Sequence, residues 1–322
     1  MEREKDPLLD SGMIRGGAIL SLTFLLAALT PYIGPIVLIL APIPVLYYHS
    51  RLGRRRGLIV LAASCLAAYG ILVLSGQGAA LPVLFMIGFV GVLLSEILKR
   101  HFSVEKTFVL ASLTLFCGAA VFFLYHAART GVTPWQMVES YVSLIVRENI
   151  KLYSQLNLSE EQVRLIRESA PQITDLFTGI FPALALAGSV LTVWFNLLVG
   201  RRLFQINGLP FPDFGDLAAW KAPEKLVWPL IAAGCMVVLP IDGFGIVGIN
   251  LLIICALIYL FQGLAIASYF FREKRIPAMI RWLFYALILI QQYMLIIVIA
   301  FGLFDMWVDF RKRIGGMKNV PV

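Results

Sequence analysis

The fold is decided by a pattern that residues 51–80 show in full: RLGRRRGLIVLAASCLAAYGILVLSGQGAA. Arg51 and the run Arg54–Arg56 come directly before the apolar segment Leu58–Leu74, and the gap that follows, Ser75–Ala80, carries no charge. A helix needs about 20 apolar residues to cross the hydrocarbon core of a bilayer, with a range of about 17–25. The stretch therefore predicts a membrane-crossing helix with one basic end and one neutral end.

The same alternation of basic and neutral gaps recurs along the chain. Four gaps between apolar runs hold 15 of the 27 basic residues: Arg51–Arg56, Lys99–Lys106, Arg201–Lys225 and Arg272–Arg281. The short gaps between them, near Tyr32–Pro35, Ser75–Ala80 and Asp242–Gly245, hold none. Because basic loops are retained in the cytoplasm, this pattern predicts a multi-pass protein of the bacterial inner membrane. We expect the N-terminus and the four basic gaps on the cytoplasmic side.

Composition excludes several other classes of protein. Apolar residues make up 60% of the chain, charged residues 14%, and the mean hydropathy is +0.85. A soluble domain would contain about 25% charged residues. The net charge of +8 does not indicate nucleic-acid binding, because the basic residues gather in loops beside apolar runs, where they contact lipid headgroups. All four cysteines lie in apolar runs without CxxC spacing, so we expect no metal site, no cofactor and no disulfide framework.

We expect an all-α bundle that forms a single integral membrane domain over residues 1–322. Nine segments are apolar and long enough, or nearly so, to cross: Ile14–Thr30, Ile33–His49, Leu58–Leu74, Ala80–Leu98, Thr107–Ala127, Ile173–Val199, Leu226–Pro240, Gly245–Phe271 and Trp282–Val308. The second and seventh are short and contain prolines, so broken or re-entrant helices are expected there. Nine crossings place the basic C-terminal tail outside; eight crossings, with one segment dipping into the membrane and returning, are the alternative.

A hydrophilic excursion over residues 128–172 separates the fifth and sixth segments. Thr133 and Pro134 form a helix start, and apolar residues then recur at helical spacing to Leu156. Ser159 and Gln162 form a capping box for a second short helix, which Pro171 is expected to end. The topology puts this amphipathic pair outside, either lying in the membrane interface or acting as a lid over a substrate.

A second loop, over residues 200–224, is expected in the cytoplasm. Its prolines forbid a continuous helix, yet Phe211, Phe214 and Trp220 are too apolar for a solvated linker. These side chains either pack back under the bundle or form a docking surface for a partner.

Signatures of catalysis are missing from the sequence. There is no HExxH, GxSxG, GxxxxGK[ST] or GxGxxG motif. Asp305 and Asp309 share one helical face, as metal-binding aspartates do, but no second aspartate-rich motif accompanies them. The sequence therefore gives no case for an enzyme.

Amides inside the apolar runs are the candidate ligand-binding groups. They are Asn196, Asn250, Gln262, Gln291 and Gln292. Adjacent glutamines cannot share one helical face, so at least one is expected to face the protein interior or a cavity. Such amides either form hydrogen bonds between helices, worth about 0.6 kcal/mol on average, or line a polar pocket.

The layout resembles the YybS-like family of bacterial membrane proteins. The resemblance lies in the proline-rich second segment, the long outer loop and the cytoplasmic segment Leu209–Pro223. The closing stretch Gly302–Arg311 also fits. That family is grouped with the substrate-binding S components of energy-coupling-factor transporters, which implies a helical substrate-binding bundle that works with a cytoplasmic ATPase module.

Two functional hypotheses follow. The first is a membrane-embedded protein that binds or transports a small molecule through the five amides. The second is a membrane scaffold or assembly factor that acts through protein contacts at Phe211, Phe214 and Trp220.

Overall fold

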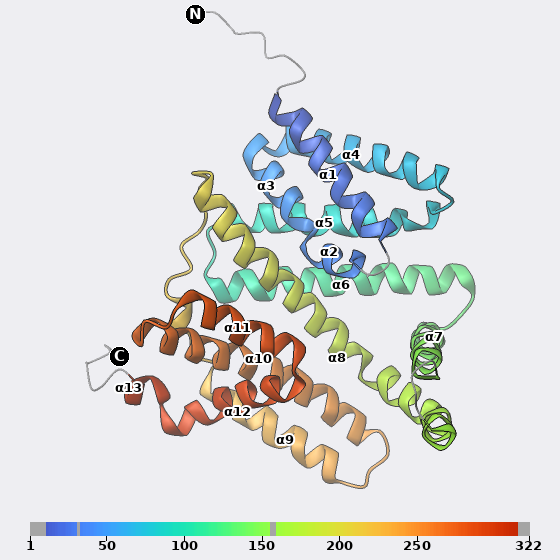
Figure 1. Ribbon diagram of the computed structural model, residues 1–322, viewed down its shortest axis with the longest axis vertical. Helices are drawn as coiled ribbons and strands as arrows, with labels where there is room; N and C mark the ends of the chain where they lie inside the picture. Colours follow the sequence, from blue (N-terminus) through green and yellow to red (C-terminus); the bar gives the residue numbers. More distant parts are fainter. Residues whose placement is uncertain (1–10, 31–32, 155–158, 315–322) are drawn as a thin grey trace, which may run out of the picture. The chain divides into compact units, whose positions relative to one another are not determined.

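The computed structural model describes residues 11–30, 33–154 and 159–314, and every regular element in those ranges is a helix (Figure 1). The chain divides into two compact units. The first unit comprises residues 1–123 and 188–214, and the second comprises residues 124–187 and 215–322. The all-helical expectation is therefore confirmed for the part of the chain that is described, while the chain contains two helical bodies.

The first unit is a bundle of apolar helices. Its elements are α1 (Ser11–Leu29), α2 (Gly34–Leu40), α3 (Pro42–Leu52), α4 (Arg54–Leu74), η1 (Gly78–Ala80), α5 (Leu81–Leu98) and most of α6 (Val104–Thr130). α3 packs between α4 and α5. A Cβ atom at Gly91 would lie only 2.4 Å from Cβ of Val45, so a glycine allows α5 to approach α3. Leu46, Leu72 and Leu94 are fully buried in this bundle.

The second unit is organised around its longest apolar helix, α10. Its elements are α7 (Pro134–Ser154), η2 (Leu217–Ala219), η3 (Glu224–Leu226), α9 (Val227–Val238), α10 (Phe244–Glu273), α11 (Ala278–Ile290), α12 (Gln292–Val308) and α13 (Phe310–Ile314). The long helix α8 (Glu160–Ile206) contributes to both units. α9 and α12 both pack along α10.

Five of the described helices are long and apolar enough to cross a membrane, and a sixth crossing is possible if the bent pair α11–α12 counts as one. α2, α3 and α5 are shorter apolar helices, and α9 has only 12 residues. Large apolar side chains such as Leu66, Leu74 and Val238 are 72%, 89% and 82% exposed. The chain is thus a multi-pass helical membrane protein whose helices offer an apolar surface to lipid.

The structure confirms the two helix starts that the sequence predicts in the hydrophilic excursion. Thr133 and Gln136 form a reciprocal capping box at the start of α7, and Ser159 and Gln162 form another at the start of α8. The expected stop at Pro171 is wrong, because α8 continues to Ile206 with two prolines inside it. A proline removes one backbone hydrogen bond, but a long apolar helix that packs on its neighbours can accommodate that loss.

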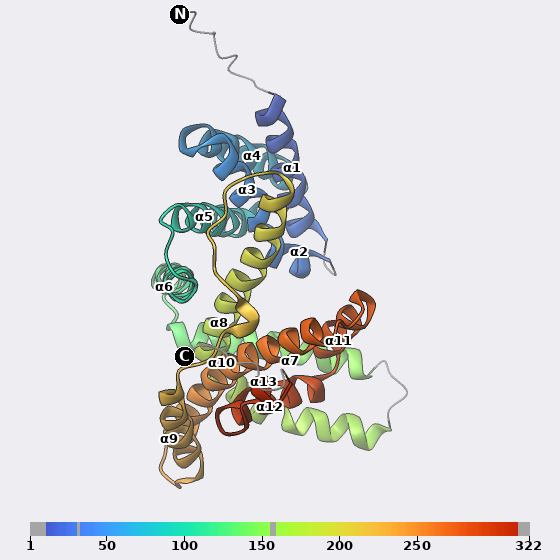
Figure 2. The ribbon, with the colours of Figure 1, turned by 90° about the vertical axis from the view of Figure 1, so that its left-hand side faces the viewer.

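The ninth apolar segment is not one helix. α11 ends at Ile290, Gln291 has an extended conformation (φ −111°, ψ 103°), and the chain direction changes by 107° before α12. Figures 1 and 2 show α11 and α12 as two arms that meet at this bend. This break lies in a segment without proline. A second break lies at Ala41–Pro42, in the proline-containing second segment, between α2 and α3.

Candidate functional site

A polar site in the second unit is formed where a loop crosses α10. We call residues 215–226 the strap. Near the start of the strap, the Asp216 carboxylate accepts a hydrogen bond from the backbone N–H of Ala218 at 3.1 Å. This bond caps the short helix η2. The Asp216 carboxylate also accepts two hydrogen bonds from Arg272 at the end of α10, at 2.9 and 2.7 Å. These bonds from Arg272 hold the pKa of Asp216 below its usual range. The strap is thereby fixed at one end of α10.

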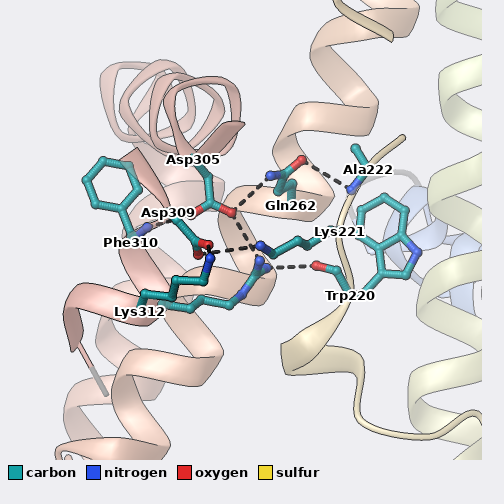
Figure 3. Close-up of polar contacts among 9 residues, drawn as sticks. Trp220, Lys221, Ala222, Gln262, Asp305, Asp309, Phe310 and Lys312 are labelled. Atoms are coloured by element: carbon teal, nitrogen blue, oxygen red, sulfur yellow. Dashed lines mark hydrogen bonds and ion pairs between the residues drawn. The ribbon is translucent and has the colours of Figure 1, made fainter. Parts of the chain in front are cut away.

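The centre of the site is a buried ion pair. Nη1 of Arg311 lies 3.0 Å from Oδ2 of Asp305, and the two side chains are 7% and 0% exposed. Nε2 of Gln262, on α10, donates to the same carboxylate oxygen at 3.1 Å (Figure 3). We call Gln262, Asp305 and Arg311 the buried cluster. A buried charge is tolerated only when it is paired and hydrogen-bonded, and this one is both.

The buried cluster also binds the strap. Arg311 donates to the carbonyl oxygen of Trp220 at 2.7 Å, and Oε1 of Gln262 accepts from the backbone N–H of Ala222 at 3.2 Å (Figure 3). The other oxygen of Asp305 accepts from the backbone N–H of Phe310 at 2.9 Å. Three side chains thus connect the strap, α10, the end of α12 and α13.

Two glycines explain how Gln262 and Asp305 come within hydrogen-bonding distance. A Cβ atom at Gly263 would lie 2.0 Å from the carbonyl oxygen of Val298, and one at Gly302 would lie 2.0 Å from that of Tyr259. No side chain fits at either place, so α10 and α12 cross with their backbones in contact. Small residues at helix crossings serve this purpose in membrane proteins. The crossing is one residue from Gln262 and less than one turn from Asp305.

Asp309 forms an outer layer of the site. It has a left-handed conformation (φ 46°, ψ 65°) at the end of α12, which breaks the helix and lets Arg311 fold back onto Asp305. Its carboxylate contacts Lys221 of the strap at 3.4 Å and Lys312 at 3.0 Å. Burial acts to raise the pKa of Asp309, but the bonds and charges of these two lysines outweigh it and hold the pKa below its usual range.

The comparison with protein families identifies the chain at a general level. A family model described as "Predicted membrane protein (DUF2232)" matches residues 18–306. The chain belongs to the DUF2232 family. No match was found among curated proteins or among solved structures. The family description agrees with the apolar helices of this DUF2232 member, and the site residues up to Asp305 lie within the matched range.

The shared contacts of Asp309 join two segments of this DUF2232 protein that are far apart in the sequence. Lys221 precedes α9 and Lys312 follows α12, yet both bind one carboxylate and are 52% and 74% exposed. The start of α9 and the end of α12 therefore lie close together.

The structure does not bring the five amides together in one place. Asn250 accepts from the backbone N–H of Ala183 and donates to the carbonyl of Gly179, which joins α10 to α8. Asn196 donates to the carbonyl oxygen of Ile39, at 2.7 Å, within the first unit. Gln291 and Gln292 are both exposed at the bend between α11 and α12. Only Gln262 belongs to the buried cluster.

The aromatic residues of the loop are largely used in internal packing. Phe211 stacks edge-to-face on Phe204 and on Phe214, with ring centroids 5.5 and 5.6 Å apart, and Phe204 in turn contacts Tyr47. Phe214 is buried, and the half-exposed Trp220 contributes its carbonyl oxygen to the buried cluster. This is the first of the two alternatives for the loop, in which its aromatic side chains pack back on the helices.

Sequence reasoning missed the role of Asp305. It considered Asp305 and Asp309 together as a metal-binding pair, but their carboxylates bind different cations, and among the described residues no group of three or more His, Cys, Asp or Glu side chains is arranged to hold a metal. In a continuous helix, residues 305 and 311 would not share a face. The missing information was the left-handed conformation of Asp309, which ends α12 and brings Arg311 back onto Asp305. In the sequence, only the basic run Arg311–Arg313 pointed to a cation near Asp305.

Proposed function

We propose that this protein binds or transports a small molecule within the bacterial inner membrane, and that α12 is its moving element. The observation that carries this proposal is the buried Asp305–Arg311 pair, hydrogen-bonded to Gln262 inside the apolar run of α10. Ionisable residues within membrane segments are costly, and they mark substrate pathways and switching elements.

The position of Gln262 supports this proposal. It stands ten residues before Arg272 in α10, which at 1.5 Å per residue is about 15 Å along the helix axis. The hydrocarbon core is about 30 Å thick. With Arg272 at the cytoplasmic edge, Gln262 lies inside the apolar run of α10, and the strap covers it from the cytoplasmic side.

The bend at Gln291 supports the same proposal. Transporters commonly form their substrate sites at discontinuous helices, because the first N–H groups of the second half have no partner within the helix. Gln291 and Gln292 stand at such a break and are exposed there. We assign ligand contact to these two glutamines, the control of α12 to the buried cluster, and helix packing to Asn196 and Asn250.

This proposal includes a topology of eight crossings and one re-entrant segment. α11 and α12 have 13 and 17 residues, and the 107° bend between them gives the pair the form of a re-entrant segment. With the strap and the end of α12 on one side, the pair enters and returns, and the basic tail lies in the cytoplasm with the N-terminus. This arrangement satisfies the positive-inside rule at Arg311–Arg313.

Partners other than lipid remain predictions from the sequence. A cytoplasmic ATPase module follows only from the resemblance to S components. The scaffold hypothesis is the second candidate: Phe211 and Phe214 pack against Phe204 and against each other, while Phe211 and Trp220 stay partly exposed.

Native mass spectrometry of the gently purified full chain tests the proposal. We expect a retained small molecule in the natural protein. Gln291→Ala with Gln292→Ala should weaken its retention about tenfold or more, the effect of losing one or two polar contacts. Gln172→Ala, at another exposed glutamine, is the matched control and should retain the ligand. A natural protein without any ligand, or equal retention in all variants, contradicts the proposal.

A further inference from the structure

The first unit contains a buried histidine whose two ring nitrogens have different neighbours. His49, in the last turn of α3, is 1% exposed, and its Nδ1 lies 2.8 Å from the hydroxyl oxygen of Ser95 on α5. Its Nε2 has no hydrogen-bond partner and lies 3.8 Å from Oε1 of Glu96, also on α5. Folded proteins leave few buried polar atoms unpaired, and those that remain often have a functional role.

Close packing of α4 on α3 encloses the imidazole. A Cβ atom at Gly57 of α4 would lie 2.7 Å from Cα of His49 and 3.0 Å from its Cδ2, so only a glycine fits at this place. The ring is therefore held between the backbone of α4 and the side chains of Ser95 and Glu96. Of these two neighbours, only Glu96 faces Nε2.

The hydroxyl groups beside Nδ1 form a path for a proton. Ser95 is fully buried, and its hydroxyl oxygen lies 2.8 Å from that of Ser50, which is partly exposed. With Ser95 donating to Nδ1, the neutral ring carries its hydrogen on Nε2, facing the Glu96 carboxylate. The other tautomer would set a lone pair of His49 against that negative charge, so we assign the hydrogen to Nε2.

The Glu96 carboxylate lies between a permanent cation and a titratable ring. Its Oε1 accepts a hydrogen bond from Nζ of Lys99 at 2.8 Å, and the same oxygen lies 3.8 Å from Nε2 of His49. The side chains of Lys99 and Glu96 are 42% and 36% exposed, so water screens their attraction. A charged imidazole is buried and screened less, and it would therefore draw the carboxylate away from Lys99.

The charged groups around His49 oppose one another. Those that act on its ring, among the described residues, are Glu96 and Lys99 of α5 and Arg54 of α4. Arg15 of α1 acts on Tyr48, α8 meets α3 at Leu46 and Tyr47, and α2 carries no ionisable side chain. The carboxylate favours a charged imidazole, whereas the two cations disfavour it.

We propose that His49 and Glu96 form a proton-binding site at the basic end of α3. Ser95 gives its hydroxyl hydrogen to Nδ1 and takes one from Ser50, and Ser50 takes the incoming proton from solvent. The positive charge on the ring is then compensated by Glu96 at Nε2. Chains of histidine and carboxylate groups act as proton relays in membrane pumps and transporters. The site shares no residue with the buried cluster, so its test is independent of the proposed function.

The test is NMR spectroscopy of the full chain in detergent with isotope-labelled histidine. The chain has three histidines, so the spectrum contains three ring signals, those of His49, His101 and His126. We expect the His49 signal to titrate between about pH 5 and 8, and its neutral form to show the hydrogen on Nε2. The signals of the other two histidines report whether each variant stays folded.

Two variants should move the midpoint of the His49 titration in opposite directions. Glu96→Gln removes the compensating charge and should shift the midpoint to lower pH, whereas Lys99→Gln removes a repelling charge and should shift it to higher pH. Glu105→Gln is the matched control, because it removes an exposed carboxylate from the first turn of α6. The control should leave the His49 midpoint unchanged.

Opposite shifts in Glu96→Gln and Lys99→Gln support the proposal, because a loss of packing alone would not move the midpoint both ways. A His49 ring that keeps one protonation state from about pH 5 to 8 overturns it. Shifts of equal size and sign in Glu96→Gln and Glu105→Gln overturn it as well.

Discussion

Two Asp–Arg pairs fix the strap, one at its start and one near its middle, and they differ most in their exposure to solvent. Asp216 and Arg272 are joined by bonds of 2.7 and 2.9 Å, and their side chains are 44% and 55% exposed. Asp305 and Arg311 are joined at 3.0 Å and are 0% and 7% exposed. The distances are similar, so the environment decides what each pair contributes.

The comparison teaches that desolvation controls the energetics of such a pair. An exposed pair contributes about 0–1 kcal/mol, because water competes for both partners. Removing one partner of a buried pair costs about 3–5 kcal/mol, since the other charge is then left without compensation. The buried pair is therefore suited to hold the end of α12 in place, while the exposed pair only positions the strap.

The largest expected effect is at Arg311. Arg311→Met keeps most of the side-chain stem but leaves the Asp305 carboxylate buried without a cation. We expect the free energy of unfolding to fall by about 3–5 kcal/mol. The measurement is unfolding of the purified full chain in mixed micelles with increasing denaturing detergent.

A double variant sharpens this prediction. Asp305→Leu combined with Arg311→Met removes both charges, and well-packed apolar residues at a buried ion pair are often neutral in stability. We expect the double variant to recover about half or more of the loss. A double variant as unstable as the single one would show that the charge pair is not the cause.

The next effect, at Gly302, tests whether the buried cluster depends on the helix crossing. Gly302→Ala would place a Cβ atom 2.0 Å from the carbonyl oxygen of Tyr259, so α12 has to move away from α10. Overpacking of this kind costs about 1–3 kcal/mol. Gly234→Ala in α9 is the matched control, because no atom lies within 4 Å of its new Cβ. The control should be neutral or slightly stabilising, and an equal loss in both variants would contradict this account of the crossing.

The smallest effect is expected at the exposed pair. Asp216→Asn should lower the free energy of unfolding by about 0–1 kcal/mol at neutral pH. The pKa of Asp216 lies below its ordinary value of 3.8, so its contribution is complete above that value and is lost as the pH falls through the folded-state pKa. The difference between the natural protein and the variant should therefore shrink towards pH 3. A difference that grows on acidification would contradict the assignment.

The sequence predicted the helices better than their connections. The apolar run Leu58–Leu74 predicted α4, and the capping boxes at Thr133 and Ser159 predicted where α7 and α8 begin. The bend at Gln291 was not predicted, because neither proline nor glycine marks it. Its direction depends on how α12 packs on α10 through Gly263 and Gly302, which is tertiary information.

The candidate site was predicted only in part. Gln262 was identified as a polar residue in an apolar run, but its two partners come from two other segments of the chain, the strap and α12. Asn250 and Asn196 carry the same signal in the sequence and bind backbone carbonyls of neighbouring helices instead. An amide in a membrane segment shows that a polar partner exists, whereas the identity of that partner depends on the packing.

The most direct test of the central claim asks whether the strap and the end of α12 lie on one side of the membrane. Single cysteines replace Lys221 or Lys312 in a background without the four native cysteines, and an impermeant thiol reagent is applied to intact and to permeabilised cells. The account predicts that both positions are protected in intact cells and that both are labelled after permeabilisation. Labelling of one position and protection of the other in intact cells would contradict it.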